Sequence, residues 1–539
     1  MLQKIRQLFT SLIIYGVGDV ATSVISFLLL PLYVRYLSPG DYGVLSLLIA
    51  AEVVTKIVFR WGIDAAFMRL YYDCATDAAR QRLASTQVLF LAAVNGVLLA
   101  AGLLAAPALA AHLFGTAQYA GALRLVLLNT FVVGFYYVPF HVMRIQGRAR
   151  TFIALTFVRS LITLLLRLVF VVGLHGGVMG VVMADVVVTG VFTLVLARWF
   201  VPLLRPVFSA GILRESLRFG LPRVPHGVAH QVIAVFDRYI LGRFVTLHEL
   251  GLYSIGASFG LAMKLFLSAF EYAWAPFYFG LMREADAKQV FSRVTTYGVA
   301  ILVLLTAGLA AVAGDLVGLM TTQQFRRAAD VVPWVAAGVG LQGVYLLTSI
   351  GLNITKHTEY YPLATGLAAG ASVVTNLLLV PRYGIAGAAL ANTVAYATLA
   401  TVAFRFSRRF YPIRYERRRL AVAVMAGAVA YLVARLLPVD SPSVAGLVAR
   451  SIIVLATFTG VLFAAGFFVH GELAMLAALG SRIRSRRTIE APVETTDMAG
   501  EVTAAPLTDA AVDAGDDPAA ARGVSPAEPA PAPAGRQAS

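Results

Sequence analysis

The stretch AEVVTKIVFRWGID, residues 51–64, continues a long apolar run and yet carries four charged residues at intervals of four. In an α-helix a step of four residues advances by 400°, so the four side chains drift over an arc of only about 120° and form one stripe. The stripe consists of Glu52, Lys56, Arg60 and Asp64. Charged side chains at membrane depth normally face a protein interior or a water-filled cavity. The stretch therefore predicts a membrane helix with one hydrated face.

The composition of the whole chain supports this environment. Hydrophobic residues make up 59% of the 539 residues and charged residues only 13%, whereas a soluble domain has about 25% charged residues. A single cysteine, Cys74, excludes an intramolecular disulfide and a multi-cysteine metal site. No HExxH, Walker loop or DxD-type signature is present. The sequence therefore predicts a membrane protein that is not an enzyme and has no cofactor. An H⁺ or Na⁺ gradient and downstream consumption of the polymer are the two alternatives for driving transport.

Apolar segments about 20 residues long, which can cross the hydrocarbon core, define the fold class. Segmentation on that length predicts an all-α polytopic protein of about 14 transmembrane helices. The first apolar run has no small-residue cleavage site and is interpreted as a retained helix. The helix starting near residue 220, FGLPRVPHGVAHQVIAVFDRY, is the most polar of the set.

The loop charges predict the orientation of these helices. Cytoplasmic loops of membrane proteins are rich in Lys and Arg, and alternate loops of this chain have that property, as in RFSRRFYPIRYERRR from residue 405. The loops HLFGTAQ and LHGG on the opposite side contain no Lys or Arg. We therefore expect both termini to be cytoplasmic. The net charge of +16 follows this loop pattern, so nucleic-acid binding is not expected.

An internal repeat predicts how the helices are grouped. DYGVLSL, from Asp41, matches ELGLYSI, from Glu249, and GGVMGVVMAD, ending at Asp185, matches YGIAGAALAN, ending at Asn392. An even number of spans per repeat makes the two halves parallel, as in many secondary transporters with a central pathway. The predicted domains are a first repeat of six helices (1–205), a second repeat of six helices (206–410), two further helices with a basic end (411–487), and a disordered acidic Ala/Pro-rich cytoplasmic tail (488–539).

The charges at membrane depth concentrate on matching helices of the two repeats. We therefore predict a cationic substrate path between the repeats, formed by Lys56, Arg60, Arg159, Arg167, Arg223, Arg238 and Lys264. These cations outnumber the acids Glu52, Asp185, Asp237 and Glu271, which favours an anionic substrate. Candidates for ion coupling are Asp19, Asp237 and Glu271. Pairing at i,i+4 within a helix, or snorkelling to the headgroups, are the structural alternatives for any one residue.

Several stretches carry a resemblance to a known family. YGVGDVATSVISFLLLPLYVRYLSPGDYGVLSLL, WGIDAAFMRLYYD, FDRYILGRFVTLHELGLYSIG, FEYAWAPFYF and LVPRYGIAGAALANTVAY resemble the bacterial polysaccharide-biosynthesis flippases, the O-antigen and capsule type oligosaccharide translocases of the multidrug/oligosaccharidyl-lipid/polysaccharide exporter superfamily. The similarity covers about residues 10–410.

This resemblance implies a V-shaped, two-lobed transporter in the bacterial cytoplasmic membrane. Its substrate would be a polyprenyl-pyrophosphate-linked oligosaccharide, moved from the inner to the outer leaflet among the membrane lipids. A polysaccharide polymerase and glycosyltransferases would be its partners. By helix, Lys56, Arg60, Arg223 and Lys264 are the nearest matches to the cavity-facing basic residues of the family.

Three other functions remain open at this level. A lipid II flippase of peptidoglycan synthesis would have the same number of spans. A multidrug and toxin extrusion exporter would typically have twelve spans and an acidic cavity, whereas the predicted cavity is basic. A membrane-embedded glycosyltransferase or polymerase would need a long periplasmic catalytic loop, and no predicted loop is long enough.

Overall fold

The computed structural model describes residues 30–437 and 442–468, and all of them belong to one compact unit that ends at Val469. Within these residues the chain is helical and contains no β-strand. Ten helices of the described part are long and apolar enough to cross a membrane. The predicted all-α polytopic membrane fold is therefore confirmed, whereas the number of fourteen spans and the domain boundaries stay predictions. The predicted tail and most of the first predicted helix lie outside the described residues.

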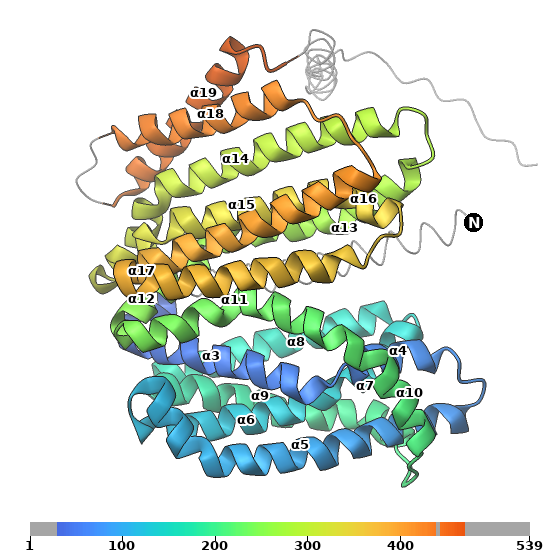
Figure 1. The fold of residues 1–539 in the computed structure, drawn as a ribbon. Coiled ribbons are helices and arrows are strands. Elements are labelled where there is room, and N and C mark those ends of the chain that lie inside the picture. Colours follow the sequence, from blue (N-terminus) through green and yellow to red (C-terminus); the bar gives the residue numbers. More distant parts are fainter. Residues whose placement is uncertain (1–29, 438–441, 469–539) are drawn as a thin grey trace, which may run out of the picture. The chain divides into compact units, whose positions relative to one another are not determined.

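The helices follow one another along the chain with short connections (Figure 1). Those of the first predicted repeat are α2 (Leu30–Tyr36), α3 (Pro39–Arg60), α4 (Ile63–Tyr71), α5 (Asp77–Phe114), α6 (Ala120–Val133), α7 (Tyr137–Ile145), α8 (Ala149–Leu168) and α9 (Gly177–Phe200). Those of the second are α10 (Ala210–Gly220), α11 (Val224–Phe244), α12 (Leu247–Gly260), α13 (Met263–Leu281), α14 (Ala287–Met320), α15 (Val332–Thr348), α16 (Ile350–Ile354) and α17 (Tyr360–Phe410). The last described helices are α18 (Arg417–Arg435) and α19 (Val444–Ala464).

The helices α3 and α12 begin with the same local structure, 208 residues apart. Ser38 and Asp41 form a capping box at the start of α3, and Thr246 and Glu249 form one at the start of α12. In each box the hydroxyl accepts a hydrogen bond from the acid's backbone N–H, and the carboxylate accepts one from the capping residue's backbone N–H. The sequence motif that suggested a repeat thus marks two equivalent helix starts.

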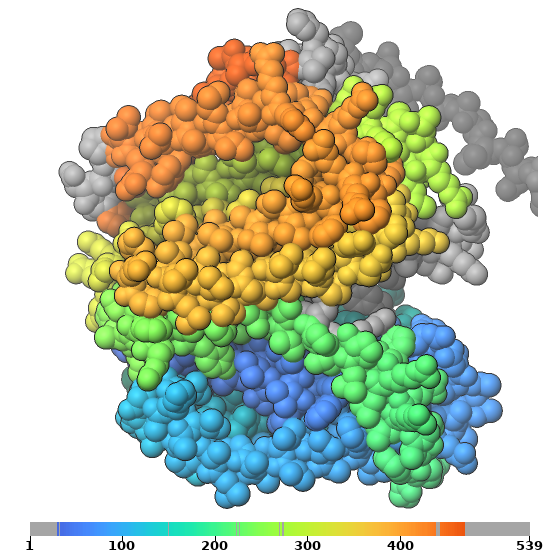
Figure 2. Space-filling view, viewed as in Figure 1, coloured from blue at the N-terminus to red at the C-terminus, as the bar shows by residue number. Residues whose placement is uncertain are grey.

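These two helix starts also contact each other closely through glycine. A Cβ atom placed on Gly43 would lie 2.0 Å from the carbonyl oxygen of Leu247, and one placed on Gly251 would lie 1.7 Å from that of Pro39. Only glycine permits two backbones to approach so closely. Along α3, the chain also packs on α11, as the adjacent blue and green atoms in Figure 2 show. Helix α3 therefore provides the main contact of the first repeat with the second.

The long helix α17 changes direction at Gly384. Its 51 residues would extend over about 75 Å if straight, more than twice the thickness of a hydrocarbon core. Gly384 has φ 53° and ψ −129°, outside the helical region, and Pro381 precedes it. Because this φ favours glycine, the sequence VPRYGIAG marks a turn between two helical segments.

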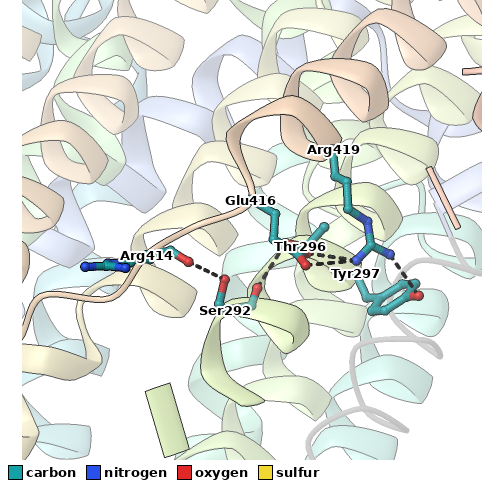
Figure 3. A network of polar contacts seen from close by, with 6 residues as sticks. All are labelled: Ser292, Thr296, Tyr297, Arg414, Glu416 and Arg419. Carbon is teal, nitrogen blue, oxygen red and sulfur yellow. Dashed lines mark hydrogen bonds and ion pairs between the residues drawn. The ribbon is translucent and has the colours of Figure 1, made fainter. Parts of the chain in front are cut away.

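The helix α18 is attached to α14 by a polar network around Arg419 (Figure 3). The Arg419 guanidinium donates to both carboxylate oxygens of Glu416, at 3.1 and 2.9 Å, and to the hydroxyl of Tyr297, at 3.0 Å. In the same region the Ser292 hydroxyl donates to the carbonyl oxygen of Arg414 at 2.8 Å. Arg419 is 9% exposed, so these charge-assisted bonds satisfy a cation that would otherwise be buried without a partner.

Candidate functional site

A charged cavity lies where α3 meets the helices of the second repeat. Two pockets, of about 420 and 220 Å³, share the lining residues Tyr33, Glu52, Arg167 and Asp185. The larger pocket extends along α8, and the smaller one extends to α11 and α12. We call the two pockets together the charged cavity. Its walls therefore come from both predicted repeats.

An ion pair between α8 and α9 occupies one wall of the charged cavity. The Arg167 guanidinium donates from Nε and Nη2 to the two oxygens of Asp185, at 2.8 and 2.7 Å. This two-bond geometry is the strongest that an arginine makes with a carboxylate. Both side chains keep about a third of their surface accessible, 36% for Arg167 and 29% for Asp185. The pair thus faces the cavity and can exchange contacts with a ligand.

The charged stripe on α3 has a different arrangement from the one that the sequence suggested. Trp61 and Gly62 have φ 51° and 70° and end α3, so Asp64 belongs to α4 and the stripe does not continue along one helix. Left-handed residues at a helix end redirect the chain, and this breaks the assumed 100° periodicity. Of the stripe, Glu52 alone lines the charged cavity within the described residues.

The other members of the stripe form i,i+4 contacts. Lys56 pairs with Glu52 at 2.6 Å. Arg60 lies 3.8 Å from Asp64, and its side chain is 63% exposed, so that contact contributes little. The first pair matches the structural alternative of self-neutralisation within the helix.

Two arginines line the charged cavity without forming an ion pair in the described part of the chain. Arg159, on α8, places its guanidinium 5.3 Å from the ring centre of Tyr136 and 5.7 Å from that of Phe192. Arg238, on α11, has a buried Nε without a hydrogen-bond partner. Cation–π contacts hold the first guanidinium in place but leave its N–H groups available. The second has hydrogen-bonding capacity that only a ligand or water can fill.

Neutral polar residues in the charged cavity were missed by the sequence reasoning. Tyr33 Oη, Ser46 Oγ and Asn129 Oδ1 line it and are buried without hydrogen-bond partners in the described structure. Ser46 is the serine of DYGVLSL, and its counterpart in ELGLYSI, Ser254, lines the same cavity. The signal was therefore present in the repeat motif, although attention to charge alone passed over it.

Asp237 lies beside the charged cavity but does not line it. The carboxylate is 5% exposed, accepts a hydrogen bond from the hydroxyl of Tyr253, and accepts another, at 2.8 Å, from the backbone N–H of Arg238. The side chain of Arg238 extends instead into the cavity. Asp237 is thus buried in the protein, whereas the side chain of the next residue, Arg238, lines the cavity.

The remaining predicted site residues lie elsewhere. Lys264 is in the first turn of α13, half-buried, with no hydrogen bond or ion pair in the described structure; it lines neither pocket of the charged cavity but is close enough to Arg238 for the two charges to repel. Glu271, also on α13, lines a separate pocket. Arg223 ends a 3₁₀ turn before α11, but its side chain is outside what the structure describes, and Asp19 lies outside the described residues.

The net charge of the cavity wall is weakly positive. Three arginines line it, Arg159, Arg167 and Arg238, against the two acids Glu52 and Asp185. One positive charge is in excess, together with unfilled hydrogen-bonding groups. Such a wall can bind an anion that accepts several hydrogen bonds, such as a phosphate. No cluster of His, Cys, Asp or Glu able to hold a metal ion occurs among the described residues.

Comparisons with known proteins agree with the sequence. A family model described as "Polysaccharide biosynthesis protein" matches residues 32–330. A comparison with curated proteins found no match. Among solved structures, the lipid II flippase MurJ in an inward closed conformation is similar, with a TM-score of 0.64, 14% identity, and coverage of 86% of this chain and 98% of that one.

A second solved structure shares the fold. It is an inward-facing multidrug resistance MATE family transporter of the MOP superfamily, with a TM-score of 0.57 and 16% identity, covering 74% of this chain and 94% of that one. At such low identities the two structures show a common fold alone. The family match, in contrast, covers more than half of the chain, and it confirms the resemblance to polysaccharide-biosynthesis proteins that the sequence carried.

Proposed function

This chain belongs to the polysaccharide biosynthesis protein family, and on that premise we propose that it is a flippase for a polyprenyl-pyrophosphate-linked oligosaccharide. The substrate enters laterally from the inner leaflet of the bacterial cytoplasmic membrane. Its charged headgroup passes through the charged cavity while the lipid tail stays in the bilayer. A glycosyltransferase supplies this substrate, and a polysaccharide polymerase consumes it on the other side.

The observation that carries this proposal is the unsatisfied guanidinium of Arg238. Its buried Nε has no partner, and the charged cavity that it lines also contains Arg159 and Arg167. A guanidinium binds phosphate oxygens through parallel hydrogen bonds, and the bond is strong where water is scarce. A pyrophosphate would therefore bind first to Arg238 and Arg159, which form no ion pair in the described structure.

The ion pair at Arg167 suggests how binding changes the conformation. A pyrophosphate that reaches Arg167 competes with Asp185 for the same two N–H groups. Since α8 and α9 are joined there by this pair, exchange of the carboxylate for phosphate loosens one wall of the cavity. A ligand shifts a conformational equilibrium only through such a difference in contacts between states.

Directional transport needs a source of free energy. We assign ion coupling to Asp237, where uptake of H⁺ or Na⁺ would neutralise a buried carboxylate beside the cavity. The measurement is transport in proteoliposomes under imposed pH or Na⁺ gradients. If neither gradient changes the rate of wild-type transport, ion coupling is contradicted. If Asp237→Asn keeps the full response to a gradient, the coupling group lies elsewhere.

A lipid II flippase is the alternative function, because its substrate is also lipid-linked. Depletion of the protein in its host distinguishes the two. Accumulation of the surface-polysaccharide intermediate, with lipid II unchanged, supports our proposal. Accumulation of lipid II instead would assign the protein to peptidoglycan synthesis.

The decisive experiment is transport of a fluorescent polyprenyl-pyrophosphate-linked oligosaccharide in proteoliposomes. Arg238→Ala should lower the initial rate about 30-fold, since one charge-assisted contact to a desolvated anion is lost. Arg238→Lys should retain more activity, because the charge remains. Arg124→Ala, which removes an exposed arginine that donates to the carbonyl oxygen of Leu103, is the matched control. Normal transport by folded Arg238→Ala would overturn the proposed path.

A further inference from the structure

Another pocket, of about 610 Å³, lies between α13, α15 with α16, and the start of α17. None of its lining residues belongs to the charged cavity. Its volume falls within the range of small-molecule sites, about 300–1,000 Å³. Pro222, in the 3₁₀ turn before α11, closes one edge. By the predicted orientation, this is the cytoplasmic end of the second repeat. We call it the tyrosine pocket, after Tyr278, Tyr345 and Tyr361 in its wall.

The tyrosine pocket offers many neutral hydrogen-bonding groups around aromatic rings. The Tyr361 hydroxyl donates to the carbonyl oxygen of Ser349 at 3.2 Å and also interacts with the side chain of Asn353, which leaves one lone pair of its oxygen unused. Asn353 Nδ2 donates to the hydroxyl oxygen of Tyr278 at 3.0 Å, so the Tyr278 proton is available to a ligand. The hydroxyl of Tyr345 has no hydrogen-bond partner among the described residues. Each tyrosine thus presents both an apolar ring and an unused polar function.

Among the described side chains that line the tyrosine pocket, the one that carries a charge is an acid. Glu271 is exposed, and its carboxylate has no hydrogen bond or ion pair in the described part of the chain. None of the lining residues whose side chains the structure describes is Lys or Arg, so among these groups a phosphate meets only the negative charge of Glu271. A carboxylate with two free oxygens can accept hydrogen bonds from adjacent hydroxyl groups. The pocket therefore favours a ligand with several O–H donors and no negative charge of its own.

A cationic ligand fits this wall less well. The most electron-rich ring, Trp274, is 3% exposed and lies between neighbours, with Phe277 stacked at 5.6 Å and Phe270 at 5.3 Å between ring centres. Its Nε1 donates to the carbonyl oxygen of Leu346. The face that a cation would need is covered, so Trp274 supports the wall of the pocket without offering a cation–π surface.

We propose that the tyrosine pocket binds the neutral sugar part of the substrate, separately from the pyrophosphate in the charged cavity. A pyranose ring has an apolar C–H face, which suits the ring of a tyrosine, and a rim of hydroxyls, which suits Glu271, Asn353 and the tyrosine hydroxyls. This assignment rests on the proposed function and adds to it a place where the transporter selects its sugar. Glu271 then acts in sugar recognition, and ion coupling is left to Asp237.

The test uses the full-length protein in lipid nanodiscs and two soluble ligands. One is the oligosaccharide released by mild acid from the host's lipid-linked pool, and the other is inorganic pyrophosphate. Saturation-transfer NMR should detect the oligosaccharide on the wild type. Tyr345→Ala and Glu271→Gln should each weaken its binding about fivefold, as expected for the loss of one or two hydrogen bonds. Tyr345→Phe, which keeps the ring and the fold, should retain an intermediate affinity.

The matched control is Arg238→Ala. It should leave oligosaccharide binding unchanged and reduce pyrophosphate binding, whereas Tyr345→Ala should do the opposite. Absence of an oligosaccharide signal from a wild type that still transports the lipid-linked substrate would overturn the tyrosine pocket and spare the proposed function. Absence of both binding and transport would overturn both. Displacement of the oligosaccharide by tetraphenylphosphonium would show a cation site and also contradict the sugar assignment.

Discussion

Close ion pairs neutralise two cations of the first repeat, whereas Arg159 in that repeat and the cations compared with them in the second repeat form none in the described structure. Arg167 is paired with Asp185, and Lys56 with Glu52. In the second repeat, Arg238 and Lys264 form no ion pair in the described structure, although the charge of Asp237 acts on Arg238 from nearby. Lys56 and Lys264 are 208 residues apart, the same offset as the two capping boxes, whereas the position that corresponds to Glu52 is Gly260.

The difference shows where the positive excess of the charged cavity comes from. A pair of opposite charges contributes no net field at a distance, so the first repeat supplies a polar but nearly neutral wall. The second repeat keeps a cation and lacks the acid, as the match of Asp185 to Asn392 also shows. Anion affinity should therefore depend mainly on the second repeat. The first repeat should provide the ion pair that a bound anion can displace.

The largest expected effect comes from removing the close contact that holds the two repeats together. Gly251→Val places a side chain against the carbonyl of Pro39, 1.7 Å from the first added carbon. We expect a loss of about 3 kcal/mol or more in the free energy of unfolding, since backbone cannot give way as a side chain can. Gly96→Ala, where nothing lies within 4 Å, is the control. Equal thermal stability of the two variants in detergent would contradict the contact.

The next effect tests the paired wall of the first repeat. Asp185→Asn leaves Arg167 without its carboxylate and should lower the free energy of unfolding by about 2 kcal/mol, between the values for exposed and buried pairs. Pyrophosphate affinity should rise, because the guanidinium is released. Asp77→Asn removes an ion pair whose acid is 88% exposed, and its stability should hardly change. Unchanged stability and unchanged pyrophosphate affinity in Asp185→Asn would remove the distinction between the repeats.

A smaller effect separates the two corresponding lysines. Lys264→Ala should raise the half-saturating substrate concentration about tenfold, or 1.4 kcal/mol, because its charge is not compensated. Lys56→Ala should raise it only about twofold, since Glu52 already cancels that charge. Lys264→Arg should be close to wild type. Transport kinetics in proteoliposomes provide the measurement, and equal effects of the two alanine variants would show that pairing does not matter.

The smallest effect concerns the end of the α3 stripe. Arg60 is 63% exposed and contacts Asp64 only at 3.8 Å, so Arg60→Ala should change transport by less than about twofold. Arg60→Lys should be indistinguishable from wild type. A tenfold loss in Arg60→Ala at normal expression would mean that the substrate reaches this helix end, beyond the charged cavity that the structure shows.

The substrate-path residues were only partly accessible from the sequence. Arg159, Arg167 and Arg238 were predicted and line one cavity, because charged residues in apolar helices stand out in any sequence. The same cavity is also lined by the neutral residues Tyr33, Asn129 and Ser46, which do not stand out in an apolar sequence as charged residues do. Whether a neutral polar side chain faces lipid, a neighbouring helix or a cavity depends on the rotation of its helix, which composition does not specify.

The sequence by itself determined that the chain is an all-α membrane protein, because apolar length and the loss of water for backbone groups leave no other choice for such segments. It also determined the equivalent helix starts at Ser38 and Thr246, since capping is local. Tertiary structure alone decided which charges are paired across helices and that Glu271 lies in a different pocket from Arg238. The reason is physical: helix formation depends on neighbours within a few residues, whereas pairing and cavities depend on contacts between α3, α8, α9, α11 and α13, which are distant in the chain and meet only when they pack.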